Sequence, residues 1–396
     1  IAQSGSDLSP CNRHFQALSK TIKDGIREAG GVPMEFPTHP IQETGKRPTA
    51  ALDRNLSYLS LVEVLYGYPI DGVILTTGCD KTTPAALMAA ATVNIPSIVL
   101  SGGPMLDGNY KGKKAGSGTI IWEARKLHAK GEIDYDEFMD MAAASAPSIG
   151  HCNTMGTASS MNSIAEALGM SLPGGAIIPA PYKERTDISF KTGKRIVEMV
   201  FENLTPSKIM TKEAFENAVY VASAIGASSN CPPHLTAIAR HMGVDFSLDQ
   251  WEKLGHSIPL LANCQPAGEH LMEGFFKAGG VPAIMKELIK DKKLNIKALT
   301  VTGKTVEENL NMKIDVNRDV IKSYENPLSH NAGFIVMKSN FFSSAVMKIS
   351  VISSEFRERY LSNKDSLNIF EVKAVVFEGP EDYHTRINDD NLKIDE

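Results

Sequence analysis

The sequence predicts an α/β protein, with a large N-terminal domain built on a parallel sheet and the beginning of a C-terminal β-barrel-like domain. In the first part of the chain, short apolar runs of strand length alternate with longer segments of helical periodicity, which is typical of parallel sheets. Beyond residue 325 the apolar residues alternate more than they repeat at helical spacing. We therefore expect an α/β domain over residues 1–325 and an incomplete β domain over residues 326–396.

One strand, helix, strand unit defines the predicted sheet. Leucines at helical spacing between residues 51 and 66 first predict a helix, which a glycine and a proline end. The unit itself follows as a buried strand DGVILTT (71–77), a helix PAALMAAATVN (84–94) and a second strand IPSIVLSGG (95–103). Because ligands usually bind at the carboxyl ends of such strands, the turn GCDKTT (78–83) is a candidate site.

Three further patterns predict local structure. The glycine-rich, basic segment GNYKGKKAGSG (108–118) matches neither a P-loop nor GxGxxG, so we expect a mobile surface loop. Ser247 and Gln250 predict a capping box at the start of a helix. Strands are expected in NAGFIVMKSN (331–340), SAVMKISVIS (344–353) and FEVKAVVFEGP (370–380).

Composition narrows the classes of function. The 41 basic and 46 acidic residues are intermixed and give a net charge of −5, so no basic stripe suits a nucleic acid. No apolar run approaches the roughly 18 to 20 residues of a membrane helix, and no signal segment opens the chain. These features predict a cytoplasmic protein without a membrane partner. The chain starts without a methionine and ends without a terminal element, so we expect a longer natural protein.

Three of the five cysteines share one kind of setting. Cys11, Cys79 and Cys152 each stand in a turn before a helix-compatible segment and are each followed by Asn or Asp. The positive end of a helix lowers the pKa of a thiol and favours the thiolate that binds metal. Their spacing is far too wide for a zinc ribbon or finger. A shared iron–sulfur or metal site and isolated buried thiols both fit this pattern, whereas Cys231 and Cys264 are interpreted as core or loop thiols.

Charged residues beside Cys79 extend the candidate site. Carboxylates suit Mg²⁺ and thiolates suit iron or zinc, so Cys79 and Asp80 could serve two different ions across one cleft. Glu43, in a loop rich in Pro and Gly, is either a further ligand or a solvated carboxylate. Lys81 is either part of the site or an ion-pair partner of Asp80.

Four blocks of the sequence carry a resemblance to a known family. They are SDLSPCNRH (6–14), HPIQETGKRPTAALDRN (39–55), TTGCDKTTPAALMAAATVNIPSIVLSGGPM (76–105) and GHCNTMGTASSMNSIAEALGM (150–170). Together they closely resemble the dihydroxy-acid and sugar-acid dehydratases, and in particular the pentonate branch of arabinonate and xylonate dehydratases. ASSNCPPHL (227–235) resembles a family segment near the active cleft, although Cys231 is unusual there and receives no role.

The resemblance implies a role for each candidate residue. Cys11, Cys79 and Cys152 match the ligands of an iron–sulfur cluster, [2Fe–2S] in the pentonate branch, with [4Fe–4S] as the alternative. Glu43, Asp80 and Lys81 match Mg²⁺ ligands, and Lys81 matches a lysine that CO₂ converts to a carbamate. Carbamylation turns a cationic amine into an anionic oxygen ligand, which suits a hard ion.

The implied reaction is the dehydration of a sugar acid, such as L-arabinonate or D-xylonate, to a 2-keto-3-deoxy acid. The cluster would act as the Lewis acid for the leaving hydroxyl, and Mg²⁺ would stabilise the enediolate. The alternatives are a dihydroxy-acid dehydratase of branched-chain amino-acid synthesis and an inactive cluster-binding sensor. In the family the serine base lies beyond the end of this chain, so we expect residues 1–396 alone to be inactive. The resemblance also implies a homodimer or homotetramer.

Overall fold

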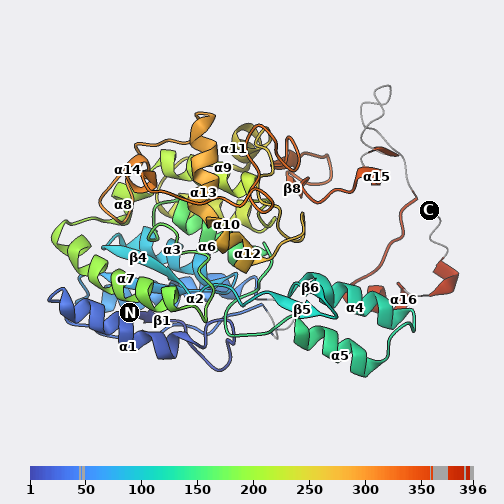
Figure 1. Cartoon of the computed structure of the whole chain (residues 1–396), viewed down its shortest axis with the longest axis horizontal. Coiled ribbons are helices and arrows are strands. Elements are labelled where there is room, and N and C mark those ends of the chain that lie inside the picture. The colour runs from blue at the N-terminus through green and yellow to red at the C-terminus, as the bar shows by residue number, and fades with distance from the viewer. Residues whose placement is uncertain (44–45, 47–49, 357, 360–372, 388, 393–396) are drawn as a thin grey trace. The chain divides into compact units, whose positions relative to one another are not determined.

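The computed structural model describes residues 1–43, 46, 50–356, 358–359, 373–387 and 389–392. The chain divides into two units, Ile1–Val351 and Ile352–Glu396, and Figure 1 colours it from blue to red along the sequence. The predicted boundary after residue 325, between the α/β domain and the beginning of a β domain, stays a prediction. None of the helices in the described part of the chain is long and apolar enough to cross a membrane.

A four-stranded parallel sheet organises the first unit. Its order is β2-β1-β3-β4, and every pair is parallel. The strands are β1 (Ala2–Gln3), β2 (Phe36–Pro37), β3 (Val73–Thr77) and β4 (Ser97–Ser101). Every residue of β3 and β4 is buried, as expected when helices cover both faces of a sheet. The predicted parallel α/β fold is confirmed.

Helices pack in pairs beside this sheet. Helix α1 (Phe15–Glu28) packs on α7 (Lys183–Phe201), which also contacts β3 and β4, and α2 (Asp53–Gly67) packs on α3 (Thr82–Val93). Glycines let α1 and α7 approach closely. A Cβ on Gly25 would lie 2.2 Å from the Phe190 carbonyl oxygen, so a larger residue there would push the two helices apart.

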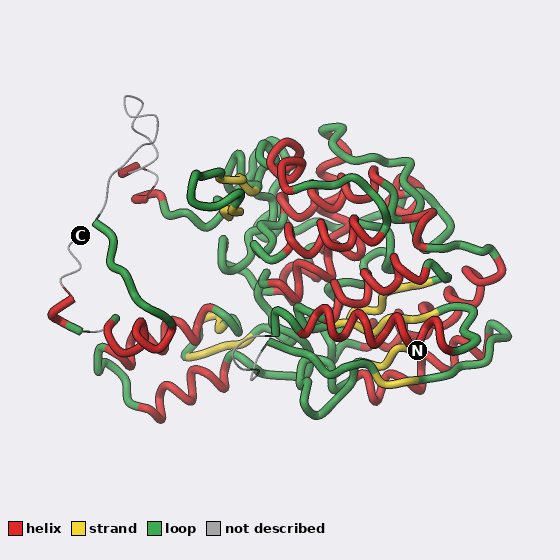
Figure 2. The backbone as a smooth tube through the Cα atoms, turned by 180° about the vertical axis from the view of Figure 1, so that it is seen from behind, coloured by secondary structure: helices red, strands yellow, loops and turns green. Residues whose placement is uncertain are grey.

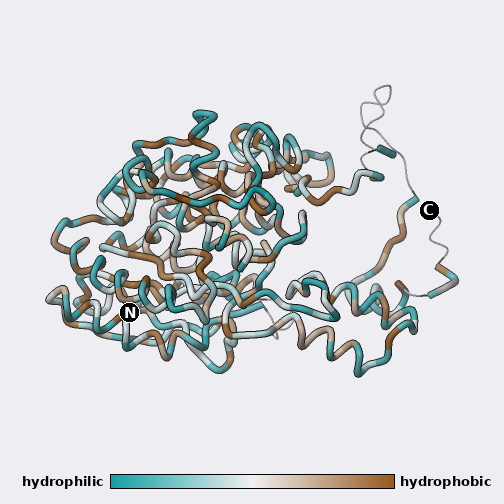
Figure 3. Tube along the Cα trace, viewed as in Figure 1, coloured by the Kyte–Doolittle hydropathy of each residue, from teal (hydrophilic) through white to brown (hydrophobic). Residues whose placement is uncertain are grey.

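A second group of helices completes the first unit (Figure 2). They are α6 (Thr157–Ala167), α8 (Pro206–Ile209), α9 (Lys212–Ala224), α10 (Cys231–His241), α11 (Leu248–Gly255), α12 (Met272–Lys277), α13 (Gly280–Lys290) and α14 (Val306–Leu310). The predicted capping box of Ser247 and Gln250 is confirmed at the start of α11. One contiguous hydrophobic core joins these helices to the sheet, and many outer turns are hydrophilic (Figure 3).

The segment expected to be a mobile loop forms a β-hairpin instead. Strands β5 (Gly108–Tyr110) and β6 (Lys113–Ala115) pair antiparallel. Lys111 and Gly112 form the turn with φ angles of 48° and 84°, and two successive positive φ angles match the twist of a tight hairpin. The usual Asn-Gly signal of such a turn is missing from the sequence, which explains the wrong prediction.

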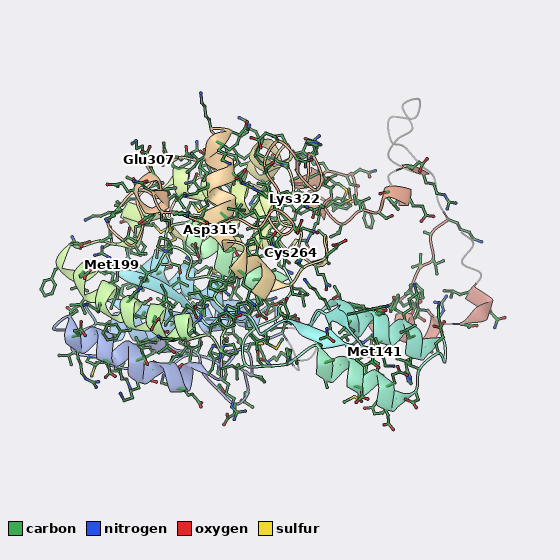
Figure 4. All side chains as sticks on the ribbon, in the orientation of Figure 1. Met141, Met199, Cys264, Glu307, Asp315 and Lys322 are labelled. Atoms are coloured by element: carbon green, nitrogen blue, oxygen red, sulfur yellow. The ribbon has the colours of Figure 1, made fainter. Side chains whose placement is uncertain are left out.

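The hairpin belongs to a small substructure with a core of its own. Helices α4 (Thr119–Ala129) and α5 (Tyr135–Ala144) complete it. Its buried side chains are Ala115, Ile120, Ala124 and Met141. Met141 is labelled in Figure 4, where it lies well apart from Cys264 of the main core.

Two of the three strands expected near the C-terminus are confirmed. β7 (Phe334–Met337) and β8 (Ala345–Lys348) form an antiparallel hairpin. In FEVKAVVFEGP, residues 370–372 lie outside the described residues, and residues 373–377 have no regular structure, so the third strand is wrong there. A strand needs a partner for its backbone groups, and the regular structure in the described part of the second unit is short and helical, as in α15 (Ser354–Phe356), α16 (Pro380–Arg386) and η2 (Asp390–Leu392).

Candidate functional site

The turn after β3 carries three of the predicted site residues. Strand β3 ends at Thr77, and Cys79, Asp80 and Lys81 precede α3. The Thr82 hydroxyl fixes this turn, because it donates to the Cys79 carbonyl at 2.8 Å and accepts from the Gly78 N–H at 3.0 Å. The side chains therefore stand at the carboxyl edge of the sheet, where parallel α/β proteins usually bind ligands.

The loop before α1 brings Cys11 to this turn. The Asn12 side-chain oxygen accepts a hydrogen bond from the Cys79 backbone N–H at 3.1 Å. A Cβ on Gly78 would lie only 2.2 Å from that oxygen, so the loop can dock because Gly78 has no side chain. The Cys11 and Cys79 thiols lie close enough that each is the largest influence on the pKa of the other. Two cysteines distant in sequence thus meet at one edge of the sheet.

Cys152 lies in the same neighbourhood. It follows His151, whose backbone bridges to Pro104, and precedes α6. Burial, together with the charges of Cys11 and Asp80, raises the pKa of the Cys152 thiol to about 11. The electrostatic influence of Cys11 and Asp80 shows that the third predicted cysteine also lies near the first two. All five cysteines are free thiols.

The contact between Cys11 and Cys79 shifts the pKa values of the two thiols in opposite directions. Contact with Cys79 lowers the pKa of Cys11, whereas contact with Cys11 and burial raise the pKa of Cys79 well above its usual value. Two coupled acids behave in this way because ionisation of the first disfavours ionisation of the second. A cation bound between the sulfurs would remove that conflict.

Glu43, Asp80 and Lys81 form the charged part of the site. The Lys81 amine lies 3.2 Å from an oxygen of Asp80 and 3.2 Å from an oxygen of Glu43. The other Asp80 oxygen accepts from the Cys79 thiol at 3.0 Å, so Asp80 links the charged residues to the cysteines. Burial alone would lower the pKa of Lys81, but Asp80 and Glu43 together raise it. Two carboxylates are thus already arranged around one cation.

A buried polar layer lies next to the cysteines. His14 donates from Nε2 to the Gly102 carbonyl at 2.9 Å, and His151 donates from Nδ1 to the Cys152 carbonyl at 3.0 Å. Burial, assisted by the Arg185 charge, lowers the pKa of His14 to about 4 and that of His151 to about 3. Both imidazoles are therefore neutral and fixed in one tautomer.

Arg185 and Glu166 complete this layer. The fully buried guanidinium donates to the carbonyls of Ser101, Gly175 and Ile178. The Glu166 carboxyl accepts from the backbone N–H groups of Gly174 at 2.7 Å and Ala176 at 2.9 Å. Burial raises the pKa of Glu166 to about 7. This layer holds the segments that follow β4 and α6.

Sequence reasoning missed one pair of polar side chains near Lys81. An Arg54 guanidinium nitrogen lies 2.9 Å from Nδ1 of the buried His234, and the Lys81 charge helps to lower the pKa of His234. Arg54 also lines a cavity of about 810 Å³ between α2, α10 and the start of α11. Both residues lie in sequence blocks that carry the family resemblance, but a separation of 180 residues hides their contact.

As the side chains stand, no group of three or more His, Cys, Asp and Glu residues among those described could hold a metal ion. The Lys81 amine, rather than an ion, lies between the two carboxylates. The ligand roles of the six predicted residues therefore stay predictions. Cys231 and Cys264 are buried thiols away from this group, and burial raises the pKa of Cys231 to about 12.

Comparison with known proteins decides the family. The model of the dihydroxy-acid/6-phosphogluconate dehydratase N-terminal region matches residues 1–309. The chain belongs to this family. The whole chain is 58% identical to a D-xylonate dehydratase of Caulobacter vibrioides, covering 66% of that protein. It is 45% identical to an L-arabinonate dehydratase of Rhizobium leguminosarum bv. trifolii, covering 67% of that protein.

A more distant relative belongs to another branch. Over 90% of its length, the chain is 39% identical to a dihydroxy-acid dehydratase of Caldanaerobacter subterraneus, and it covers 65% of that protein. The chain thus spans about two thirds of the length of the curated relatives that it matches. The family suggested by the motifs is confirmed.

Proposed function

We propose that the full-length protein is a sugar-acid dehydratase, a hydro-lyase that converts a pentonate such as D-xylonate or L-arabinonate to a 2-keto-3-deoxy acid. One observation carries this proposal: Cys79 contacts Cys11, while Lys81, two residues later, contacts Glu43. A single turn therefore presents soft sulfur ligands on one side and hard oxygen ligands on the other. The names of the relatives with higher identity support a sugar acid over a branched-chain dihydroxy acid.

The residues present fit the groups that the family resemblance implies. Cys11, Cys79 and Cys152 would hold an iron–sulfur cluster, for which we propose the [2Fe–2S] type, and their free thiols, buried at Cys79 and half-buried at Cys11 and Cys152, suit it. Glu43, Asp80 and a carbamylated Lys81 would hold Mg²⁺, and the two carboxylates around one cation suit that ion. When bound, these groups supply Lewis-acid chemistry for the loss of hydroxide.

This chain's own residues would prepare the site for that chemistry. The Asn12 contact to the Cys79 N–H fixes the turn, and the Thr82 hydroxyl holds its other end. Asp80 contacts both Cys79 and Lys81, so it sets the spacing between the two sides of the site. The serine that would take the C2 proton lies outside this chain by the family resemblance. We also propose a cytoplasmic location and a homodimer or homotetramer.

The test is a rate comparison on full-length protein reconstituted anaerobically. D-xylonate, L-arabinonate and 2,3-dihydroxyisovalerate are assayed side by side, with iron and sulfide measured on the same sample. We expect a 2-keto-3-deoxy acid from at least one pentonate at a higher kcat/KM than for the branched substrate. A preference for 2,3-dihydroxyisovalerate would favour the branched-chain alternative. A cluster without any turnover would favour the sensor, and a robust rate from residues 1–396 alone would contradict the expected inactivity of this chain.

A further inference from the structure

Arg54 fixes the proton position on His234. A guanidinium has only donors, so the His234 Nδ1 that lies 2.9 Å from Arg54 must accept. The neutral ring then carries its proton on Nε2. Arg54 itself is held by Asn55, whose side-chain oxygen accepts from Nε at 3.1 Å and from Nη2 at 3.0 Å. His234 therefore presents one defined donor, the Nε2–H group.

That donor has no partner in the described part of the chain. His234 is only 5% exposed, and its Nε2 atom is buried without a hydrogen bond. A buried donor left without an acceptor destabilises the fold, so native proteins usually satisfy such a group. Burial, together with the charges of Arg54 and Lys81, lowers the pKa of His234 to about 3. The ring thus stays a neutral donor close to Lys81.

The surroundings of this donor favour a negatively charged acceptor. The described partners of Arg54 are the neutral side chains of Asn55 and His234, and no carboxylate among the described residues forms a salt bridge with it. His234 lies in the first turn of α10, where the helix N-terminus adds positive potential. A carboxylate would satisfy the Nε2–H group and offset both sources of positive charge.

We propose that His234, held by Arg54 in the Nε2–H tautomer, binds the carboxylate of the sugar acid. This inference rests on the proposed function and adds a substrate-binding residue to it. Arg54 acts as a positioning residue, because it sets which nitrogen of His234 carries the proton. The carboxylate would then be oriented by a residue of α10, whose electrostatic coupling to Lys81 places it near the charged residues of the site.

Kinetics on the full-length protein tests the role of the donor. His234→Leu removes the Nε2–H group, whereas His234→Gln keeps an N–H donor at a similar reach. A hydrogen bond to a charged group predicts a KM for D-xylonate about 10- to 100-fold higher for His234→Leu, with a much smaller change in kcat. We expect His234→Gln to restore most of the affinity. An unchanged KM for His234→Leu would overturn the proposal.

A matched control lies on the same helix. His241 also belongs to α10, where its Nδ1 lies 3.0 Å from the Thr92 hydroxyl and its ring packs on Tyr58. His241→Gln should leave the KM for D-xylonate unchanged. Equal losses in the His241 and His234 variants would mean that any disturbance of α10 weakens binding, which would also overturn the proposal. Iron content shows in each case that the variant has folded around the cluster.

The tautomer gives a readout that does not depend on activity. Nitrogen NMR of ¹⁵N-histidine-labelled full-length protein should show His234 protonated on Nε2, and Arg54→Met should release this preference. D-xylonate should shift the Nε2–H signal, whereas the neutral polyol xylitol should not. An Nδ1–H tautomer, or an equal shift with xylitol, would overturn the proposal even if His234→Leu fails to fold. Absence of pentonate turnover by the wild type would instead count against the proposed function.

Discussion

The cysteines and the carboxylates of the site differ in how their negative charge is balanced. Contact with Cys11 and burial raise the pKa of Cys79, and burial with the charge of Cys11 raises the pKa of Cys152, so ionised sulfurs there need added positive charge. Asp80 and Glu43, by contrast, are already neutralised in part by the Lys81 amine between them. The two sides share one turn, yet they should fail separately when a residue other than the linking Asp80 is changed.

The largest expected effect is on the cysteines. Cys79→Ser should prevent stable cluster assembly, because Cys79 lies between Cys11 and Asp80 and serine is a poor ligand for iron. Iron and acid-labile sulfide on anaerobically reconstituted protein should fall from about two of each per chain to near zero. Cys264→Ala is the matched control, since this buried thiol lies outside the site, and it should keep its iron. Full iron in Cys79→Ser would remove Cys79 from the ligand set.

The second effect should leave the cluster intact and abolish turnover. Lys81→Met removes the amine that would become the carbamate, and we expect kcat of the full-length protein to fall on the order of 1,000-fold with iron unchanged. Lys81→Arg separates two explanations, because it keeps a cation between Asp80 and Glu43 but cannot be carbamylated. An equal loss in both variants supports the carbamate. Activity retained in Lys81→Arg would mean that the residue acts as a cation.

The third effect concerns the buried layer and appears as a dependence of stability on pH. Burial raises the pKa of Glu166 to about 7 from its ordinary value of 4.5, so the folded protein holds this proton more tightly than the unfolded chain. That contribution is fully present below about pH 4.5 and is lost as the pH rises through about 7. The loss amounts to about 3 kcal/mol of unfolding free energy.

Glu166→Gln isolates this contribution. Glutamine resembles the protonated acid, since it offers one oxygen to Gly174 or Ala176 and cannot ionise. Denaturant unfolding at pH 5 and pH 8 should show the wild type losing stability relative to this variant as the pH rises. The difference between the two proteins removes the opposite contribution of His14 and His151, whose lowered pKa values destabilise the fold at low pH. A difference independent of pH would contradict the prediction.

The strands around the site could be predicted from the sequence, whereas the helix faces could not. Apolar runs between Gly and Pro gave β3 and β4 to within a few residues, because a fully buried strand has a simple signal. Leu52, Leu56 and Leu59 correctly predicted helix α2, yet they are 79%, 56% and 57% exposed. The helix buries Ser57, Leu61 and Leu65 against its neighbours instead. Periodicity finds a helix but cannot choose between two apolar faces.

Likewise, the part of the candidate site that lies in one local segment could be predicted, whereas contacts between distant segments could not. Cys79, Asp80 and Lys81 could be grouped because they share one turn, and the resemblance added Cys11, Cys152 and Glu43. The contact of Arg54 with His234 joins α2 to α10, and its chemistry depends on a tautomer that only the folded neighbours set. Nothing in either local sequence predicts that pairing.

The smallest expected effect concerns Glu43, the most exposed of the three charged residues of the site. The Glu43 side chain is 41% exposed, whereas that of Asp80 is 14% exposed and also contacts Cys79. Solvent can replace part of what Glu43 does, so Glu43→Gln should lower kcat/KM of the full-length protein only about tenfold, with added Mg²⁺ restoring part of the loss. Asp80→Asn should cost more and respond less to Mg²⁺, because it changes both sides of the site. If Glu43→Gln proved the more damaging of the two, the exposed loop and not the turn after β3 would dominate Mg²⁺ binding.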